Sequence, residues 1–282
     1  MIISEPIILI DYLTKKQNIS RKKAKMLLTN GLVYVNNEKQ TKYNYPLLQG
    51  SNVEIKEYNV KAMSKSDIDI IYENKDILVV NKPAGLLTIS TLKEKEKTLY
   101  HKVSNYIKNK NKNAKIFIIH RLDKETSGIV IFAKNEKTKN IYQKNWDKFV
   151  IYRGYIAIVE GRPKKNKDRV INYLTENEKT LKIYSTTKDK GKLSITNYEV
   201  VKYNSKYSLL NIEIETGRKN QIRVTMKDMN CPIVGDEKYG SKSCSLKRMA
   251  LHANKLTIIN HSNGNILKLN SDMPDIFKKI IN

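Results

Sequence analysis

The stretch His120-Arg121-Leu122-Asp123-Lys124-Glu125-Thr126-Ser127-Gly128 is the most informative part of this sequence, because it places a dense run of polar residues between two apolar segments. The flanking segments, 115–119 and 129–133, have the length and composition of buried strands. A polar loop between buried strands is a rigid mounting for a reactive side chain. An Asp in such a loop is also a common turn former, so the spacing alone leaves the role of Asp123 open.

Segments of strand length dominate the chain on both sides of this loop. They recur at 68–72, 77–81, 115–119, 128–133, 150–160, 193–203, 208–215 and 249–259, and helical patterns occupy 98–109, 135–147, 218–229 and 274–281. The strands do not alternate regularly with helices, which argues against a doubly wound parallel sheet and predicts an α+β fold. The Lys- and Asn-rich tract 108–115 and the tract 163–168 are expected to be solvated loops.

The N-terminal part has a pattern of its own. Residues 7–13 and 20–30 have the pattern of two short amphipathic helices, the second with Ser20 as N-cap and Asn30-Gly31 as C-cap. Segments 32–37 and 50–55 predict two strands, and a polar stretch without pattern follows. These features predict a small α/β domain at 1–58, a linker at 59–67 and a large domain at 68–282.

The charge balance indicates a polyanionic partner. The chain of 282 residues has 53 Lys and Arg against 28 Asp and Glu, a formal net charge of +25, and nucleic acid is the usual partner of such a protein. Only eight of the basic residues are Arg, and the chain is also rich in Asn and Ile, so coding bias could inflate the Lys count. The Arg positions are therefore the more informative ones.

Several classes of protein are not indicated by this sequence. Cys231 and Cys244 have no metal-ligand spacing, and the four His residues are scattered singly, so neither a metal site nor a disulfide framework is expected. The first residues lack the pattern of a secretory leader, and no window approaches the 18 apolar residues of a membrane helix. We expect a cytoplasmic protein without membrane association.

The N-terminal segments 20–28 and 30–36 resemble the S4-type RNA-binding domain, and the resemblance covers roughly residues 5–55. In that family the basic second helix and the strand after it lie on structured RNA. The resemblance implies phosphate contacts for Arg21, Lys22 and Lys25, which would position the protein without reading sequence. Without the resemblance, these basic residues would equally fit a solvated helix face.

The large domain resembles the RluA-type pseudouridine synthase family, whose hallmark is His-Arg-Leu-Asp followed by Thr-Ser-Gly and an apolar strand. Four further segments agree with the family in order and content: 77–86, 152–161, 216–224, and 235–240 together with 249–253. Any one of them is weak, but five in the right order make a chance resemblance very improbable. The resemblance implies a mixed, mostly antiparallel sheet with a central cleft.

The resemblance also implies roles for individual residues. Asp123 would be the catalytic carboxylate, Tyr155 the aromatic ring that stacks on the target base, and Arg223 the basic partner of the carboxylate. Arg121 would reach into the RNA helix where the uridine is extruded, and Arg218 is a further candidate RNA contact. On the residues alone, Tyr155 fits a core aromatic in a strand, and Arg223 fits a charge on a helix surface.

Other positions have structural expectations or depart from the family. The segment 82–85 is expected to be a strand-ending turn, and His120 to organise the loop rather than to react. Asp236 and Tyr239 are expected to brace the end of the sheet. The family commonly has His at the positions of Asn220 and Thr225, where a residue would support the site or touch RNA.

Pseudouridylation would account for the absence of cofactor and metal motifs, because the base is cut from its ribose and rejoined through carbon without redox change. A carboxylate suits this chemistry, since it can attack or support an electron-poor carbon. Burial can raise the pKa of an Asp by roughly 3–5 units, and a neighbouring Arg can lower it by roughly 1–3 units, which keeps the carboxylate ionised.

The resemblance implies large-subunit ribosomal RNA as the substrate, because family members with an S4-type module commonly act there. Transfer RNA is the alternative substrate. Two rival functions stand beside these: a catalytically silent RNA-binding factor in ribosome assembly, and a metal-dependent RNA-processing enzyme. We expect a monomer that uses no cofactor.

Overall fold

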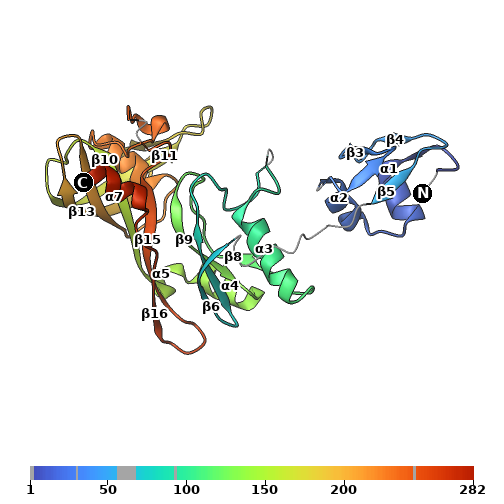
Figure 1. Cartoon of the computed structure of the whole chain (residues 1–282), viewed down its shortest axis with the longest axis horizontal. Helices are drawn as coiled ribbons and strands as arrows, with labels where there is room; N and C mark the ends of the chain where they lie inside the picture. The colour runs from blue at the N-terminus through green and yellow to red at the C-terminus, as the bar shows by residue number, and fades with distance from the viewer. Residues whose placement is uncertain (1–2, 30, 56–67, 92–93, 244–245) are drawn as a thin grey trace. The chain divides into compact units, whose positions relative to one another are not determined.

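The computed structural model of the chain describes residues 3–29, 31–55, 68–91, 94–243 and 246–282. The chain divides into a small N-terminal unit and a larger C-terminal unit (Figure 1). The predicted linker at 59–67 lies outside the described residues. None of the described helices is long and apolar enough to cross a membrane.

The small unit packs short helices on short strands. Its elements are β1 Ile7–Ile8, α1 Leu9–Asp11, the π-helix Tyr12–Lys16, α2 Arg21–Thr29, β2 Val33–Val35, β3 Glu38–Gln40, β4 Pro46–Leu47 and β5 Val53–Ile55. Strands β3, β2 and β5 form one sheet, and β1 pairs with β4. The core contains the fully buried residues Leu9, Leu13, Leu28, Val33 and Leu47.

Of the two helices predicted in this unit, the second is confirmed at its N-terminal end and the first is wrong at its start. The backbone N–H of Lys23 donates to Ser20 Oγ at 3.3 Å, which confirms the predicted N-cap of α2. Asn30 of the predicted C-cap lies outside the described residues, whereas Gly31 has the left-handed φ of 64° that such a cap needs. The prediction of a helix at 7–13 is wrong at its start, because residues 7 and 8 pair with β4 as a strand.

The large unit is built on one mixed sheet. Its strands are β6 Asp69–Glu73, β7 Ile77–Lys82, β8 Phe117–Ile118, β9 Ser127–Ala133, β10 Val150–Glu160, β11 Lys167–Glu176, β12 Ile183–Thr186, β13 Lys192–Tyr203, β14 Tyr207–Ile214, β15 Leu251–Ile259 and β16 Ile266–Asn270. The order is β12-β11-β13-β14-β10-β15-β9-β7-β6, with β16 on β15 and β8 on β9. Within this described sheet β15 and β9 are parallel and the other pairs antiparallel, which confirms the predicted α+β class.

Helices cover parts of this sheet. They are α3 Leu99–Lys110, α4 Glu136–Lys144, α5 Trp146–Phe149, α6 Gln221–Asp228 and α7 Asp275–Ile281, with a 3₁₀ turn at Glu237–Tyr239. The single helix predicted at 135–147 is wrong, because the backbone breaks at Asn145 (ψ 41°) between α4 and α5. Helix α6 begins three residues later than predicted, at Gln221.

Three strands of the large unit were missed by the prediction from sequence. Strand β11 begins at Lys167, inside the predicted loop 163–168, and β12 and β16 were not predicted at all. These strands lie at or near sheet edges and have at least one solvent-facing side, so their polar residues hide the strand pattern. The predicted loop at 108–115 is likewise shorter, because α3 continues to Lys110.

The centre of the sheet positions the functional loop. Every residue of β9 is buried, and β9 lies between β7 and β15. The polar loop of residues 120–126 therefore leads directly into a strand that is held on both sides. A side chain on this loop has a rigid support.

Candidate active site

A pocket of about 400 Å³ opens where the polar loop faces β10 and α6. Its lining comes from three parts of the large unit: Arg121, Leu122, Asp123 and Thr126 of the loop, Tyr155, Ile214 and Leu251 of the sheet, and residues 217–223 at the start of α6. The structure thus brings together five of the predicted site residues, namely Arg121, Asp123, Tyr155, Arg218 and Arg223. The other three, Arg21, Lys22 and Lys25, are exposed on α2 of the small unit.

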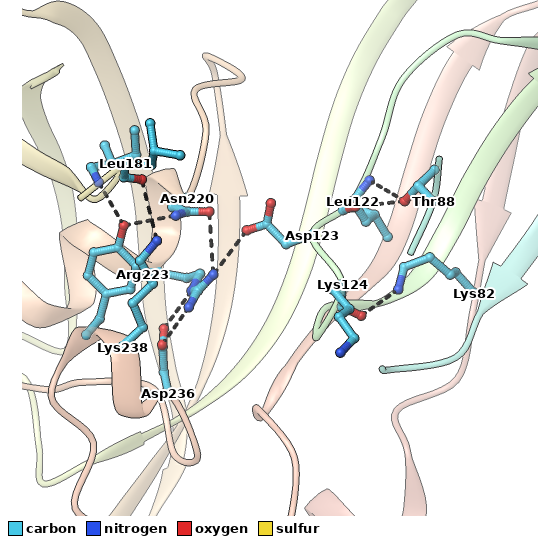
Figure 2. Close-up of polar contacts among 12 residues, drawn as sticks. Lys82, Thr88, Leu122, Asp123, Lys124, Leu181, Asn220, Arg223, Asp236 and Lys238 are labelled. Carbon is cyan, nitrogen blue, oxygen red and sulfur yellow. Dashed lines mark hydrogen bonds and ion pairs between the residues drawn. The ribbon is translucent and has the colours of Figure 1, made fainter. Parts of the chain in front are cut away.

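A buried lysine holds the loop on one side of Asp123. Lys82 has no solvent-exposed surface, and its Nζ donates to the carbonyl oxygens of Pro83 and Leu86 at 2.9 and 2.7 Å. It also donates to the carbonyl oxygen of Lys124 at 3.0 Å (Figure 2). Three carbonyls match the three N–H groups of a protonated amine. Burial lowers the pKa of Lys82 to about 8, whereas Glu125 and Asp123 act to raise it. The predicted turn at 82–85 is therefore also an anchor of the functional loop.

A threonine holds the loop on the other side of Asp123. Thr88 Oγ1 donates to the carbonyl of Leu122 at 2.7 Å and accepts from the backbone N–H of Leu122 at 3.2 Å (Figure 2). Further along, Gly128 has a φ of 115°, and a Cβ there would lie 2.2 Å from the carbonyl oxygen of Ala253. The backbone around Asp123 is therefore fixed by polar contacts before it and by close packing after it.

Arg223 connects two carboxylates. Its Nε and Nη2 donate to Asp236 Oδ2 and Oδ1, both at 2.7 Å, and its Nη1 lies 3.4 Å from Asp123 Oδ2 (Figure 2). The guanidinium carbon lies 4.8 Å from the ring centroid of Tyr239, whose hydroxyl accepts from Asn220 Nδ2 at 2.9 Å. The guanidinium group of Arg223 is thus held by Asp236 through two nitrogens and by the ring of Tyr239. Its third nitrogen, Nη1, is left to face Asp123.

The structure changes the roles expected for two of these residues. Asp236 and Tyr239 do not simply brace the sheet end, because they fix the orientation of Arg223. Asp236 is 3% exposed, and such a buried carboxylate needs a cationic partner. The sequence offered one signal for this, the Gly235-Asp236 pair just before Tyr239, but nothing in the spacing tied it to Arg223.

Tyr155 fits both interpretations that the sequence allowed. Its ring packs against hydrophobic clusters of the sheet and also lines the pocket with Asp123. Burial raises the pKa of Tyr155 to about 12, although Arg153 acts to lower it. The hydroxyl is therefore protonated at neutral pH.

The two departures from the family lie in different places. Asn220 lines the pocket, has a left-handed φ of 54° just before α6, and holds the hydroxyl of Tyr239. Asn is one of the few side chains that adopt this backbone conformation readily. Thr225 is fully buried, with Oγ1 3.5 Å from Thr196 Oγ1 and from Asn172 Oδ1. Thr225 therefore takes part in the packing of α6 on the sheet.

His120 organises the loop, in line with its expected role. Its Nε2 accepts from the backbone N–H of Ile131 at 3.1 Å, and its ring lies 5.3 Å from that of Trp146. Burial, together with the charge of Arg153, lowers the pKa of His120 to about 4. The imidazole is therefore neutral near pH 7 and acts as an acceptor.

This shifted pKa predicts a loss of stability in mild acid. The unfolded His120 titrates near 6.5 and the folded one near 4, so the stabilisation is full above pH 6.5 and falls as the pH drops towards 4. Between pH 7.5 and pH 5 we expect urea unfolding to show that the parent loses up to about 2 kcal/mol more than His120→Asn, which keeps an acceptor. Equal losses in the two proteins would place the acid sensitivity elsewhere.

Among the residues that the structure describes, no three His, Cys, Asp or Glu side chains are grouped as metal ligands would be. The pocket instead offers one carboxylate facing an Arg, one aromatic ring and a basic rim. Such a site can hold a flipped base over the ring, with the carboxylate and its Arg partner beside the ribose.

Comparison with known proteins agrees with this geometry. The RNA pseudouridylate synthase family model matches residues 76–228, and the S4 domain model matches residues 9–53. Ribosomal large subunit pseudouridine synthase D of Borreliella burgdorferi is 37% identical over 202 residues, which cover 69% of this chain and 62% of the relative. Ribosomal large subunit pseudouridine synthase C of Rickettsia felis is 32% identical over 242 residues, covering 84% of this chain and 78% of the relative.

A solved structure shows the same fold. Human RNA Pseudouridylate Synthase Domain Containing 4 superposes with a TM-score of 0.63 at 23% identity, over 78% of this chain and 92% of that one. The fold, the family models and the relatives agree with the motifs around Asp123. The chain therefore belongs to the RNA pseudouridylate synthase family and joins an S4 domain to the fold of that family.

Proposed function

We propose that this chain isomerises uridine to pseudouridine in large-subunit ribosomal RNA. The observation that carries the proposal is the ion pair of Asp123 and Arg223, 3.4 Å apart in a pocket that also holds the ring of Tyr155. The substrate rests on two kinds of support: the names of the relatives, which are ribosomal large subunit enzymes, and the S4 domain.

In this proposal each residue of the pocket has a task. The N–C bond of uridine breaks, the base turns, a C–C bond forms, and the carbon that joins the ribose loses its proton while the freed nitrogen gains one. Asp123, fixed through its backbone, supports the electron-poor carbon during cleavage. Arg223 holds the Asp123 carboxylate through an ion pair, and stacking on Tyr155 offsets the cost of taking the base out of its helix, which is a few kcal/mol.

The direct test uses purified protein and transcripts of large-subunit ribosomal RNA and of transfer RNA, with a strong chelator present. We expect pseudouridine in the ribosomal transcript despite the chelator. Pseudouridine in the transfer RNA transcript alone would show that transfer RNA, the alternative, is the substrate. Tight RNA binding without any product would favour the silent assembly factor, and a requirement for added metal would favour a metal-dependent enzyme.

Tyr155 allows ring and hydroxyl to be tested separately. Tyr155→Ala should bind RNA roughly 5- to 100-fold more weakly, because the flipped base loses the ring on which it stacks. Tyr155→Phe should bind as the parent does, yet convert roughly 10²-fold more slowly if the hydroxyl takes the carbon-bound proton. Because its pKa is about 12, the hydroxyl must hand on its own proton in the same step. Single-turnover conversion by Phe at the parental rate would exclude this role and leave stacking.

The S4 domain should contribute to affinity through phosphate contacts. Replacing the exposed Arg21, Lys22 and Lys25 of α2 together by Ala should flatten the salt dependence of RNA affinity by roughly 0.7–0.9 per lost contact on a log–log plot. A matched control removes three exposed lysines of the other unit, at 137, 144 and 148. An unchanged slope for the α2 variant would remove this helix from the RNA contact.

A further inference from the structure

Strands β11, β12 and β13 have one covered and one uncovered face. On the covered face, Val224 of α6 is buried against Leu174 and Ile183. Successive side chains of a strand point to opposite faces, so the residues between these positions point away from α6. Five of them are apolar or aromatic: Ile171, Tyr173, Tyr184, Leu193 and Ile195. We call this group the β11–β13 face.

The β11–β13 face is open to solvent. Ile171 is 51% exposed, Tyr184 44% and Leu193 39%, while Tyr173 and Ile195 are half-buried. Isolated exposed apolar residues are normal on a protein surface, but a contiguous group of them marks an interaction site.

The strand register makes this group contiguous. Ile171 lies opposite Ile195, and Tyr173 lies opposite Leu193. Tyr184 lies opposite Thr175, which puts it diagonal to Tyr173 across β11 and β12. Directly opposed side chains are about 4.5–5.5 Å apart and diagonal ones about 7–8 Å apart. The two tyrosine rings are therefore neighbours on one surface.

Cationic side chains join this face to the pocket. Arg218 lines the pocket and donates through Nε to the carbonyl of Leu193, at 2.9 Å, on the face. Arg169 lies two residues before Ile171 and is held by Glu215, whose carbonyl also accepts from Arg153. Arg218 therefore contacts both the pocket and the end of β13 that contains Leu193.

The charge around the face fits a polyanion better than a protein surface of mixed charge. Residues 163–193 contain nine Lys and Arg against four Asp and Glu. Unpaired RNA has two kinds of group that this surface can bind. Its phosphates pair with basic side chains, and its bases stack on aromatic rings.

We propose that the β11–β13 face binds unpaired nucleotides of the substrate RNA next to the target uridine, with bases stacked on Tyr173 and Tyr184. The proposal rests on the proposed function, because it takes the pocket as the site that holds the target. It extends that function by adding a surface that selects RNA with a looped or frayed strand beside the modified position.

The test measures RNA affinity in the Asp123→Asn protein, so that the result does not depend on catalysis. Tyr184→Ala should weaken binding of a large-subunit ribosomal RNA fragment by roughly 5- to 100-fold, and Tyr184→Phe by less than about twofold, because Phe keeps the stacking face. Ile266→Ala on β16 removes a side chain that is 61% exposed and serves as the control with parental affinity. Parental affinity for Tyr184→Ala would overturn the proposal.

Two further measurements guard against misleading outcomes. With 4-thiouridine beside the target, irradiation of the parent should crosslink the RNA to the peptide that contains Tyr184, and crosslinks confined to other peptides would overturn the proposal even if the variant misfolds. Sedimentation of the parent should show no dimer that depends on Tyr184. A dimer that Tyr184→Ala dissociates would contradict the proposal, because the face would then be a contact between two copies of the chain. Formation of pseudouridine by the parent is measured separately. A crosslink to the β11–β13 face without any pseudouridine would contradict the proposed function but would still support RNA binding by this face.

Discussion

Asp123→Asn should abolish turnover, with a loss of at least roughly 10³-fold, while RNA affinity changes by less than about threefold. Asn has the same shape as Asp, and the backbone on both sides of it is held by Lys82 and Thr88, so the pocket should keep its form. Only the negative charge and the nucleophilic oxygen are lost. Arg223 stays in place because Asp236 still binds it.

The matched control for this prediction is the other carboxylate of the same loop. Glu125 does not line the pocket and pairs with Lys124 at 3.7 Å on the surface. Glu125→Gln should therefore convert RNA within about threefold of the parent, in single-turnover assays on the same transcript. If Asp123→Asn retained turnover within tenfold of the parent, another residue would perform the chemistry.

Arg223→Lys should be the second most damaging change, with turnover reduced by roughly 10²-fold. The guanidinium binds Asp236 through two nitrogens and directs a third towards Asp123, whereas an ammonium is a single point charge that cannot do both. Lys would be drawn to the more buried Asp236 and leave Asp123 without its partner. We expect this loss mainly in single-turnover rate at saturating RNA, not in RNA affinity.

A second arginine controls for the change of side chain itself. Arg162 lies on the surface over the ring of Tyr203, outside the pocket, so Arg162→Lys should convert RNA at the parental rate. Thermal unfolding of both variants separates loss of fold from loss of chemistry. Full activity of a folded Arg223→Lys protein would show that turnover does not require the guanidinium group of Arg223.

Sequence patterns predicted the fold where burial dictates residue type. Strand β10 coincides with the predicted segment 150–160, because its centre is apolar on both sides. Strand β11 was missed because charged and polar residues occur on both of its faces, so the sequence shows no clean alternation of apolar and polar positions. The late start of α6 was missed because Arg218, Lys219 and Asn220 have ordinary helix-surface composition, while Asn220 adopts a left-handed backbone.

The site could be predicted in part. The resemblance to a family placed Asp123, Tyr155 and Arg223 together, and the structure brings them into one pocket. The groups that hold them were not predictable, because a buried lysine bound to three carbonyls and an Arg bound to Asp236 depend on segments brought together by folding. Contacts between residues that are far apart in the sequence leave no pattern in the local spacing of residues.

The central claim is most directly tested by mapping pseudouridines through carbodiimide labelling and primer extension in RNA from cells with and without this gene. We expect one or a few sites in large-subunit ribosomal RNA to be lost without the gene, restored by the parent chain, and not restored by Asp123→Asn. Identical maps of ribosomal and transfer RNA in both kinds of cell would contradict the account.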